Sequence, residues 1–463
     1  MLTRRPLVTL ALASALLTAC GGNNSGSSNN DTNNTVSATF VDNAVSGLQY
    51  LCSSTSEKQL TNSQGVLQCE KNDTVTFYVG SIELGKTVMT ESTVFITPAT
   101  LVGEDSNEDT DSVFNMAKFL IGLDSDQDTS NGISIAPESL IFVGEELNFD
   151  QSAEDFADSA ATIMTQLTQN VEDGPFPLAN DEDARDHIII GLYLSHAGLY
   201  EGMVNYPTGN RKIALLVSRE GGAYGTNRTL AGKYASSGIS SRNRFDTVGR
   251  SNDIQVDGST ETPRLIKTSI VNGVLSGRSI AEDNDELAPV IAAMAPPPEE
   301  PEEFEGEEGP EEPVLDDGDD AILIEARRVV TFDSVFDQSV VDKFDDLLPL
   351  AIDFGDKGVF VIDRTSKRMS GFHYASYPGG TPHAADEDNE LEGWDTNIGE
   401  IISARDNKIH LIAMSVNGYL VDMTMNMSGE QPVMNASWRH LYEGAKGTTS
   451  TYETEYEYDS RLK

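Results

Sequence analysis

The 463-residue chain has little positive charge. Lys and Arg together number 31 against 75 Asp and Glu, which leaves a formal net charge of −44 at pH 7. A protein that binds nucleic acid or an anionic membrane surface by electrostatics needs a basic face to neutralise phosphates. The sequence therefore indicates a protein with no nucleic-acid partner and without a polybasic membrane-binding surface.

Aromatic residues and long apolar runs are also scarce. Aromatic side chains make up 7% of the chain and hydrophobic residues 38%. After the first twenty residues, no run is long and apolar enough to cross a bilayer. The remaining apolar residues suffice for packed cores, and a chain of this length predicts two to four domains of roughly 100–200 residues each.

The N-terminus is typical of an export signal. Arg4 and Arg5 precede an apolar run over residues 7–17, and small residues follow. The sequence Leu-Thr-Ala-Cys that ends at Cys20 resembles the lipobox of bacterial lipoproteins. This resemblance implies a signal peptide over 1–19, lipidation of Cys20 and, because Gly21 rather than Asp follows, sorting to the outer membrane. A plain signal peptide with an incidental cysteine is the alternative, and the sequence leaves open whether the protein faces the surface or the periplasm.

The segment 20–35 consists almost wholly of Gly, Ser, Asn, Asp and Thr. Such a composition cannot bury apolar surface, so we expect a flexible tether. The chain has three cysteines, and lipidation of Cys20 would leave Cys52 and Cys69. An oxidising envelope favours a disulfide between these two residues, with two free buried thiols as the alternative.

Residues 36–102 alternate short β-type runs with turns, which predicts a small β module. The runs Val45–Tyr50 and Val75–Gly80, with Cys52 and Cys69 between them, resemble small β-sandwich modules of bacterial surface lipoproteins and adhesin-like proteins. The resemblance implies a disulfide-bonded stalk or spacer that carries no catalytic residue.

Residues 103–186 predict a helical connector. Two apolar stripes have helical spacing, and Ser112 and Ser152 are the expected caps at their starts. The stripes are formed by Val113, Met116, Ala117, Leu120 and Ile121 in the first helix, and by Phe156, Ala160, Ile163, Met164 and Leu167 in the second.

An acidic loop follows the first of these helices. Asp124, Asp126 and Asp128 alternate along it, and three converging carboxylates are the hard oxygen ligands that Ca²⁺ prefers. The loop resembles the first half of an EF-hand loop. It departs from that pattern at Thr129, where the EF-hand has glycine, and at Ile135, where it has a bidentate glutamate. A solvated acidic turn is the alternative to a calcium site.

Residues 187–463 predict an antiparallel β domain, a barrel or a sandwich. Candidate hairpins lie at 212–224, 359–374 and 410–427, and the alternating segment 452–458 predicts a further strand. An insert over 282–320 holds 17 acidic residues, seven prolines and no Lys or Arg, which predicts a disordered segment. The expected fold is therefore mainly β with a helical connector.

The chain contains none of the common catalytic signatures: no GxSxG, HExxH, Walker or GxGxxG motif occurs. The sequence thus favours a non-enzymatic, lipid-anchored envelope protein that works by adhesion or ligand capture, its ligand or envelope partner being undetermined. Two alternatives stay open. One is an envelope hydrolase that acts on glycans or peptides through carboxylates, and the other is a structural partner of another outer-membrane protein.

Overall fold

The computed structural model describes residues 34–457 except for 43, 104, 129–130, 145, 208, 230–235, 242–244, 257–263, 281–320, 354–358, 365–370, 378–395, 415–418, 430–431 and 441–451. The predicted signal peptide, Cys20, nearly all of the predicted tether and the acidic insert 282–320 lie outside the described residues. The described part is mainly β, as predicted. No helix within it combines the length and the apolar character needed to span a membrane.

The first strands form sandwich-like sheets, as the sequence predicts. One sheet has the order β5-β1-β8, another the order β4-β3-β6-β7, and β2 pairs with β9. Phe40 of β1 and Phe77 of β6 are fully buried, with ring centroids 4.9 Å apart, so side chains of the two larger sheets share one core. The strands are β1 (Thr35–Phe40), β2 (Val45–Ser46), β3 (Gln49–Cys52), β4 (Gln59–Leu60), β5 (Val66–Glu70), β6 (Thr74–Val79), β7 (Ile82–Val88), β8 (Phe95–Ile96) and β9 (Ile133–Ser134).

The predicted disulfide between Cys52 and Cys69 is present, with the two Cα atoms 5.7 Å apart. Cys52 ends β3 and Cys69 lies in β5, so the bond joins the two larger sheets. Both cysteines are buried.

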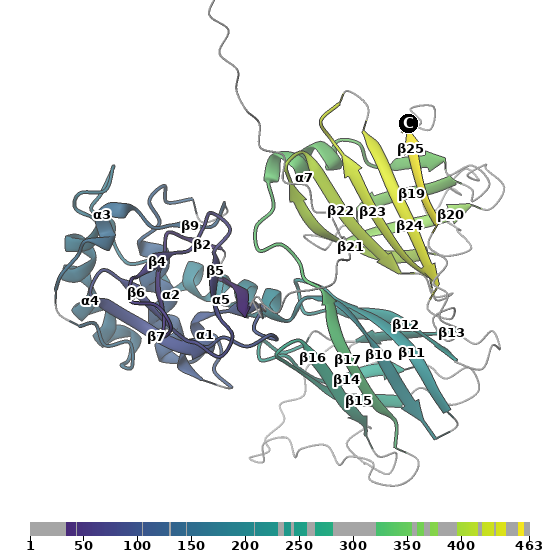
Figure 1. The fold of residues 1–463 in the computed structure, drawn as a ribbon, viewed down its shortest axis with the longest axis horizontal. Coiled ribbons are helices and arrows are strands. Elements are labelled where there is room, and N and C mark those ends of the chain that lie inside the picture. Colours follow the sequence, from purple (N-terminus) through teal and green to yellow (C-terminus); the bar gives the residue numbers. More distant parts are fainter. Residues whose placement is uncertain are drawn as a thin grey trace, which may run out of the picture. The chain divides into compact units, whose positions relative to one another are not determined.

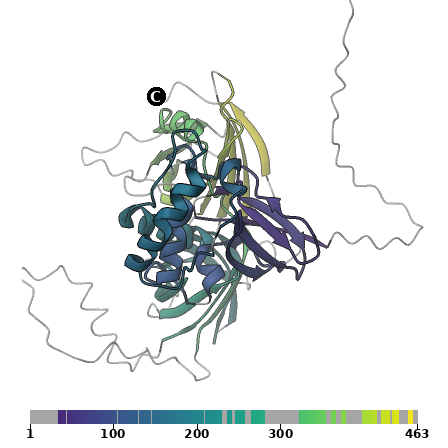
Figure 2. The ribbon, with the colours of Figure 1, turned by 90° about the vertical axis from the view of Figure 1, so that its left-hand side faces the viewer.

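Helices pack against these strands in the same hydrophobic core. Figure 2 shows them on one side of the purple strands. The sequence predicts that the helices over 103–186 pack against each other or the neighbouring sheet. The apolar stripes of α2 and α4 join the core of residues 38–96, because each helix must bury its apolar face. The helices are α1 (Pro98–Val102), α2 (Asp111–Gly122), α3 (Pro137–Leu140), α4 (Ala153–Thr168) and α5 (Asp181–His196).

Of the two expected N-caps, Ser152 is present and Ser112 is not. The Ser152 side chain accepts a hydrogen bond from the Asp155 amide, as predicted for α4. Helix α2 begins two residues earlier than expected, with Thr110 rather than Ser112 at its N-cap.

Helix α5 differs from the expectation that β structure begins at His187. The Asn180 side chain caps its first turn by accepting from the Asp183 amide, and that turn carries three acidic residues, which complement the helix dipole. Ile188 and Leu192 are buried in the core that the first strands share. Capping and burial thus outweigh the β propensity of the three consecutive isoleucines at 188–190.

Strands β10 to β17 form a closed barrel in which each strand pairs with its neighbours along the chain (Figure 1). Strand β17 pairs with both β16 and β10 and so closes it. The acidic insert therefore connects two adjacent strands, β16 and β17. The strands are β10 (Gly198–Tyr206), β11 (Gly209–Val217), β12 (Ala223–Thr229), β13 (Ser236–Ser241), β14 (Arg250–Val256), β15 (Arg264–Val271), β16 (Val274–Ser279) and β17 (Leu323–Val330).

A second sheet of eight strands follows, again in sequence order. Helix α7 (Gln338–Asp345) packs on one of its faces through Val340, Val341 and Phe344. The predicted hairpins at 359–374 and 410–427 and the predicted strand near 452–458 are all present. The strands are β18 (Leu350–Asp353), β19 (Val359–Arg364), β20 (Gly371–Tyr377), β21 (Thr396–Arg405), β22 (Lys408–Met414), β23 (Tyr419–Asn426), β24 (Val433–His440) and β25 (Tyr452–Glu457).

Strands β11 and β22 each bury both faces. In β11, Ile213 and Leu215 lie in the barrel core, whereas Ala214 and Leu216 belong to a second cluster. Ile412 of β22 belongs to that same second cluster. A strand buried on both sides has a continuous apolar run instead of alternation, which explains the unbroken apolar sequence of β11.

Candidate functional site

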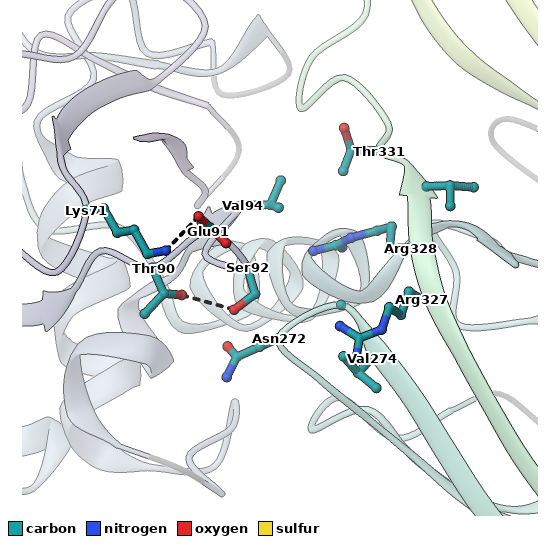
Figure 3. Close-up of a pocket in the computed structure, with 12 residues that line it drawn as sticks. Lys71, Thr90, Glu91, Ser92, Val94, Asn272, Val274, Arg327, Arg328 and Thr331 are labelled. Carbon is teal, nitrogen blue, oxygen red and sulfur yellow. Dashed lines mark hydrogen bonds and ion pairs between the residues drawn. The ribbon is translucent and has the colours of Figure 1, made fainter. Parts of the chain in front are cut away.

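A pocket of about 540 Å³ lies beside the barrel, at the end of β17. Its barrel side is formed by Arg327 and Arg328 of β17 and by the turn between β15 and β16. Lys71 and the segment that carries Glu91 line the opposite side. Figure 3 shows both arginine side chains extending from the barrel toward the segment with Glu91 and Ser92.

The turn between β15 and β16 shapes the floor of this pocket. Asn272 and Gly273 both have positive φ, 48° and 73°, as the tight turn of a two-residue hairpin requires. The Gly273 carbonyl accepts a hydrogen bond of 2.8 Å from the Arg328 amide, which fixes the turn against β17. Side-chain atoms of Arg328 also lie close to Gly273 in the turn.

Arg328 is held mainly by helix α5. Its Nη1 donates to the carbonyl oxygens of Ser195, at 2.6 Å, and Ala197, at 3.3 Å. These carbonyls lie at the C-terminal end of the helix, where a cation complements the helix dipole. The guanidinium also lies 5.2 Å from the centroid of the Phe95 ring, within range of a cation–π interaction.

One nitrogen of Arg328 has no acceptor. Its Nε is buried and lacks a hydrogen-bond partner among the described residues. Burial lowers the pKa of the guanidinium from its ordinary value, but an arginine side chain stays protonated in proteins. The pocket therefore contains a fixed positive charge with an unsatisfied donor.

Arg327 is the more accessible of the two arginines. Its side chain is 73% exposed, and Glu325, on the same strand, lies 4.0 Å away. Lys71, across the pocket, forms a 2.6 Å ion pair with Glu91 and is largely neutralised by it. The hydroxyl groups of Thr90, Ser92 and Thr331 add neutral donors to the lining.

This arrangement suits the binding of an anion. Two guanidinium groups face a hollow that also offers hydroxyl and amide donors, and a guanidinium matches the geometry of a carboxylate or phosphate. Neither arginine belongs to the residues that the sequence predicts as a site. The sequence contains two signals that point to this pocket. Two adjacent arginines follow the acidic insert, and an Asn-Gly pair favours a hairpin.

The acidic loop lies between helix α2 and strand β9. Asp124 is fully buried, and its Oδ1 accepts a 2.9 Å hydrogen bond from the Ser134 amide. Its Oδ2 is buried without a hydrogen-bond partner among the described residues. Asp126 is exposed and accepts from the Asp128 amide at 3.0 Å and from the Asn131 side chain at 3.1 Å.

The carboxyl groups of Asp124 and Asp126 lie within hydrogen-bonding reach of each other. Burial, and to a smaller extent the neighbouring Asp126, raises the pKa of Asp124 to about 6. The Asp128 amide and the Asn131 side chain help to lower the pKa of Asp126. The structure thus brings two of the three predicted calcium ligands together, while Asp128 contributes its backbone to the turn.

Comparison with known proteins gave no relatives. No protein-family model matches this sequence, and neither the curated proteins nor the solved structures gave a match.

Proposed function

We propose that this protein is a lipid-anchored binding protein of the bacterial envelope that captures a small organic anion in the pocket beside β17. The ligand carries a carboxylate or phosphate group and is bound without chemical turnover. The observation that supports this proposal is the pair Arg327 and Arg328, which present positive charge to a defined pocket in a chain of net charge −44.

The pocket has the size of a small-molecule site. About 540 Å³ falls in the range of roughly 300–1,000 Å³ that ligand pockets occupy. The acidic remainder of the protein repels anions at long range, so capture depends on short-range contacts with the two guanidinium groups. We therefore expect a moderate affinity.

Changing Arg327 to alanine should weaken binding of the anion about tenfold, because one charge-assisted hydrogen bond is lost. Isothermal titration calorimetry at low salt, with inorganic phosphate and glucuronate as probes and glucose as the neutral comparison, measures this. Arg327 is largely exposed, so its replacement should leave the melting temperature unchanged.

Arg278 provides the matched control. It lies on β16, next to β17, but does not line the pocket. Arg278→Ala should therefore bind both anions as the unaltered protein does. Equal affinities of Arg327→Ala and Arg278→Ala for every anionic probe would contradict the proposed binding site.

The lipid anchor rests on the lipobox-like sequence that ends at Cys20. Changing Cys20 to alanine should shift the protein from the membrane fraction to the soluble fraction, because the residue that carries the acyl chains is lost. Fractionation with immunoblotting measures the distribution, and Ser27→Ala, in the same N-terminal segment, controls for a substitution there. Retention of the Cys20 variant in membranes would count against the anchor.

A further inference from the structure

We infer that the loop after helix α2 is a calcium site in which Asp124 and Asp126 supply carboxylate ligands. This inference is independent of the anion pocket, because none of the loop residues lines that pocket. It rests on the geometry of the two carboxyl groups.

The decisive feature is the unsatisfied oxygen of Asp124. Its side chain is fully buried and one oxygen, Oδ1, is fixed by the Ser134 amide. The other oxygen, Oδ2, has no donor among the described residues, and leaving a buried carboxylate oxygen unpaired is costly. The neighbouring group within reach is the Asp126 carboxylate, itself an acceptor. When both groups are ionised, the two acceptors repel each other, and a cation between them removes this repulsion.

The surrounding structure holds the two carboxylates in place. Helix α2 is buried from Val113 to Gly122 and leads directly into Asp124. The far end of the loop is fixed by β9, where the Ile133 and Ile135 amides donate to Ala44 and Ser46. The Ser125 amide also donates to the Ser134 carbonyl at 2.9 Å, which closes the loop. The two ends are therefore fixed before any ion binds.

The position beside a helix end further favours a cation. Asp124 follows the C-terminus of α2, where the helix dipole contributes partial negative charge. Adding a divalent cation there relieves repulsion between the dipole and the two carboxylates.

The ligand atoms that the loop offers indicate which cation it binds. Residues 124–135 contain no histidine or cysteine, so the side chains offer oxygen ligands and disfavour zinc and copper. An irregular loop does not impose octahedral geometry, and Mg²⁺ gives up its water molecules reluctantly, whereas Ca²⁺ accepts irregular oxygen shells. Calcium sites of extracellular modules have dissociation constants of roughly 10⁻⁴–10⁻³ M.

The test compares calcium binding by the full-length protein, stripped with EGTA, and by two variants. Asp126→Asn removes one proposed ligand at an exposed position, where folding should tolerate the change. Asp158→Asn on α4 removes an equal charge from an exposed position away from the loop. This pair separates a defined site from nonspecific attraction of cations to an acidic protein.

We expect 5 mM Ca²⁺ to raise the melting temperature of the unaltered protein and of Asp158→Asn by about 5 °C, and 5 mM Mg²⁺ to raise it much less. Calorimetric titration should show that Asp126→Asn binds calcium about tenfold more weakly. An equal response of Asp126→Asn and Asp158→Asn to calcium would overturn the inference, as would an equal effect of the two metals on all three proteins.

Discussion

Replacing Cys52 and Cys69 together by alanine should lower the free energy of unfolding by about 3 kcal/mol. The disulfide closes a loop with a sequence separation of 17, and the chain-entropy model gives roughly this stabilisation for such a loop. The bond also joins the two larger sheets of the sandwich, so its loss removes a restraint between them. Alanine avoids placing a hydroxyl group at two buried positions.

Calorimetry with and without dithiothreitol measures this effect. The reductant should lower the melting temperature of the unaltered protein to that of the double variant, by roughly 5–10 °C, and leave the variant unchanged. If mass spectrometry confirmed complete reduction while the melting temperature stayed constant, the disulfide would have no stabilising role.

Changing Asp42 to asparagine should make stability less dependent on pH. Asp42 is 1% exposed, and neither carboxylate oxygen has a hydrogen-bond partner among the described residues. Burial raises its pKa from an ordinary value of 3.8 to about 7. Its titratable neighbour is His187 on α5, whose ring donates to the Asp42 carbonyl and whose pKa is lowered, mainly by burial.

The native state binds the Asp42 proton more tightly than the unfolded state does. Between about pH 4 and pH 7, the native state retains the Asp42 proton and the unfolded state has lost it. The free energy of unfolding therefore falls as pH rises through this window, and the whole contribution, on the order of 4 kcal/mol, is lost above about pH 7. Asparagine cannot ionise, so the variant should gain stability relative to the unaltered protein between pH 4.5 and pH 8.

Urea unfolding at each pH gives the difference between the two proteins. This difference in the free energy of unfolding reports the ionisation of Asp42 alone, because His187 and the surface carboxylates titrate in both proteins. Asp158→Asn, which removes an exposed carboxylate, should show a difference that hardly changes with pH. A constant difference between Asp42→Asn and the unaltered protein would show that Asp42 is ionised normally.

Much of the local structure could be predicted because it depends on neighbours along the chain. The stripe from Val113 to Ile121 predicts α2, and its members are buried as a helix with one apolar face requires. Similarly, the Asn-Gly pair at 417–418 predicts the hairpin of β22 and β23, which pair in register. The predicted disulfide followed from composition, since only two cysteines remained once Cys20 was assigned to the lipid.

The sites were predictable only in part. Alternating aspartates suggest a cation site, but the burial of Asp124 and its unpaired Oδ2 depend on how α2 and β9 meet. The pocket beside β17 was not predicted, because Arg327 and Lys71 are more than 250 positions apart in the chain. No local pattern relates residues that far apart.

By itself, the amino-acid sequence determined the mainly β character, the positions of several hairpins and helices, and the pairing of Cys52 with Cys69. These features follow from short-range periodicity, turn chemistry and composition. The closure of β10 to β17 into a barrel, the shared core of strands and helices, and the placing of two arginines around one pocket were decided only by the tertiary structure. Each of these depends on long-range packing, in which many distant side chains become buried together.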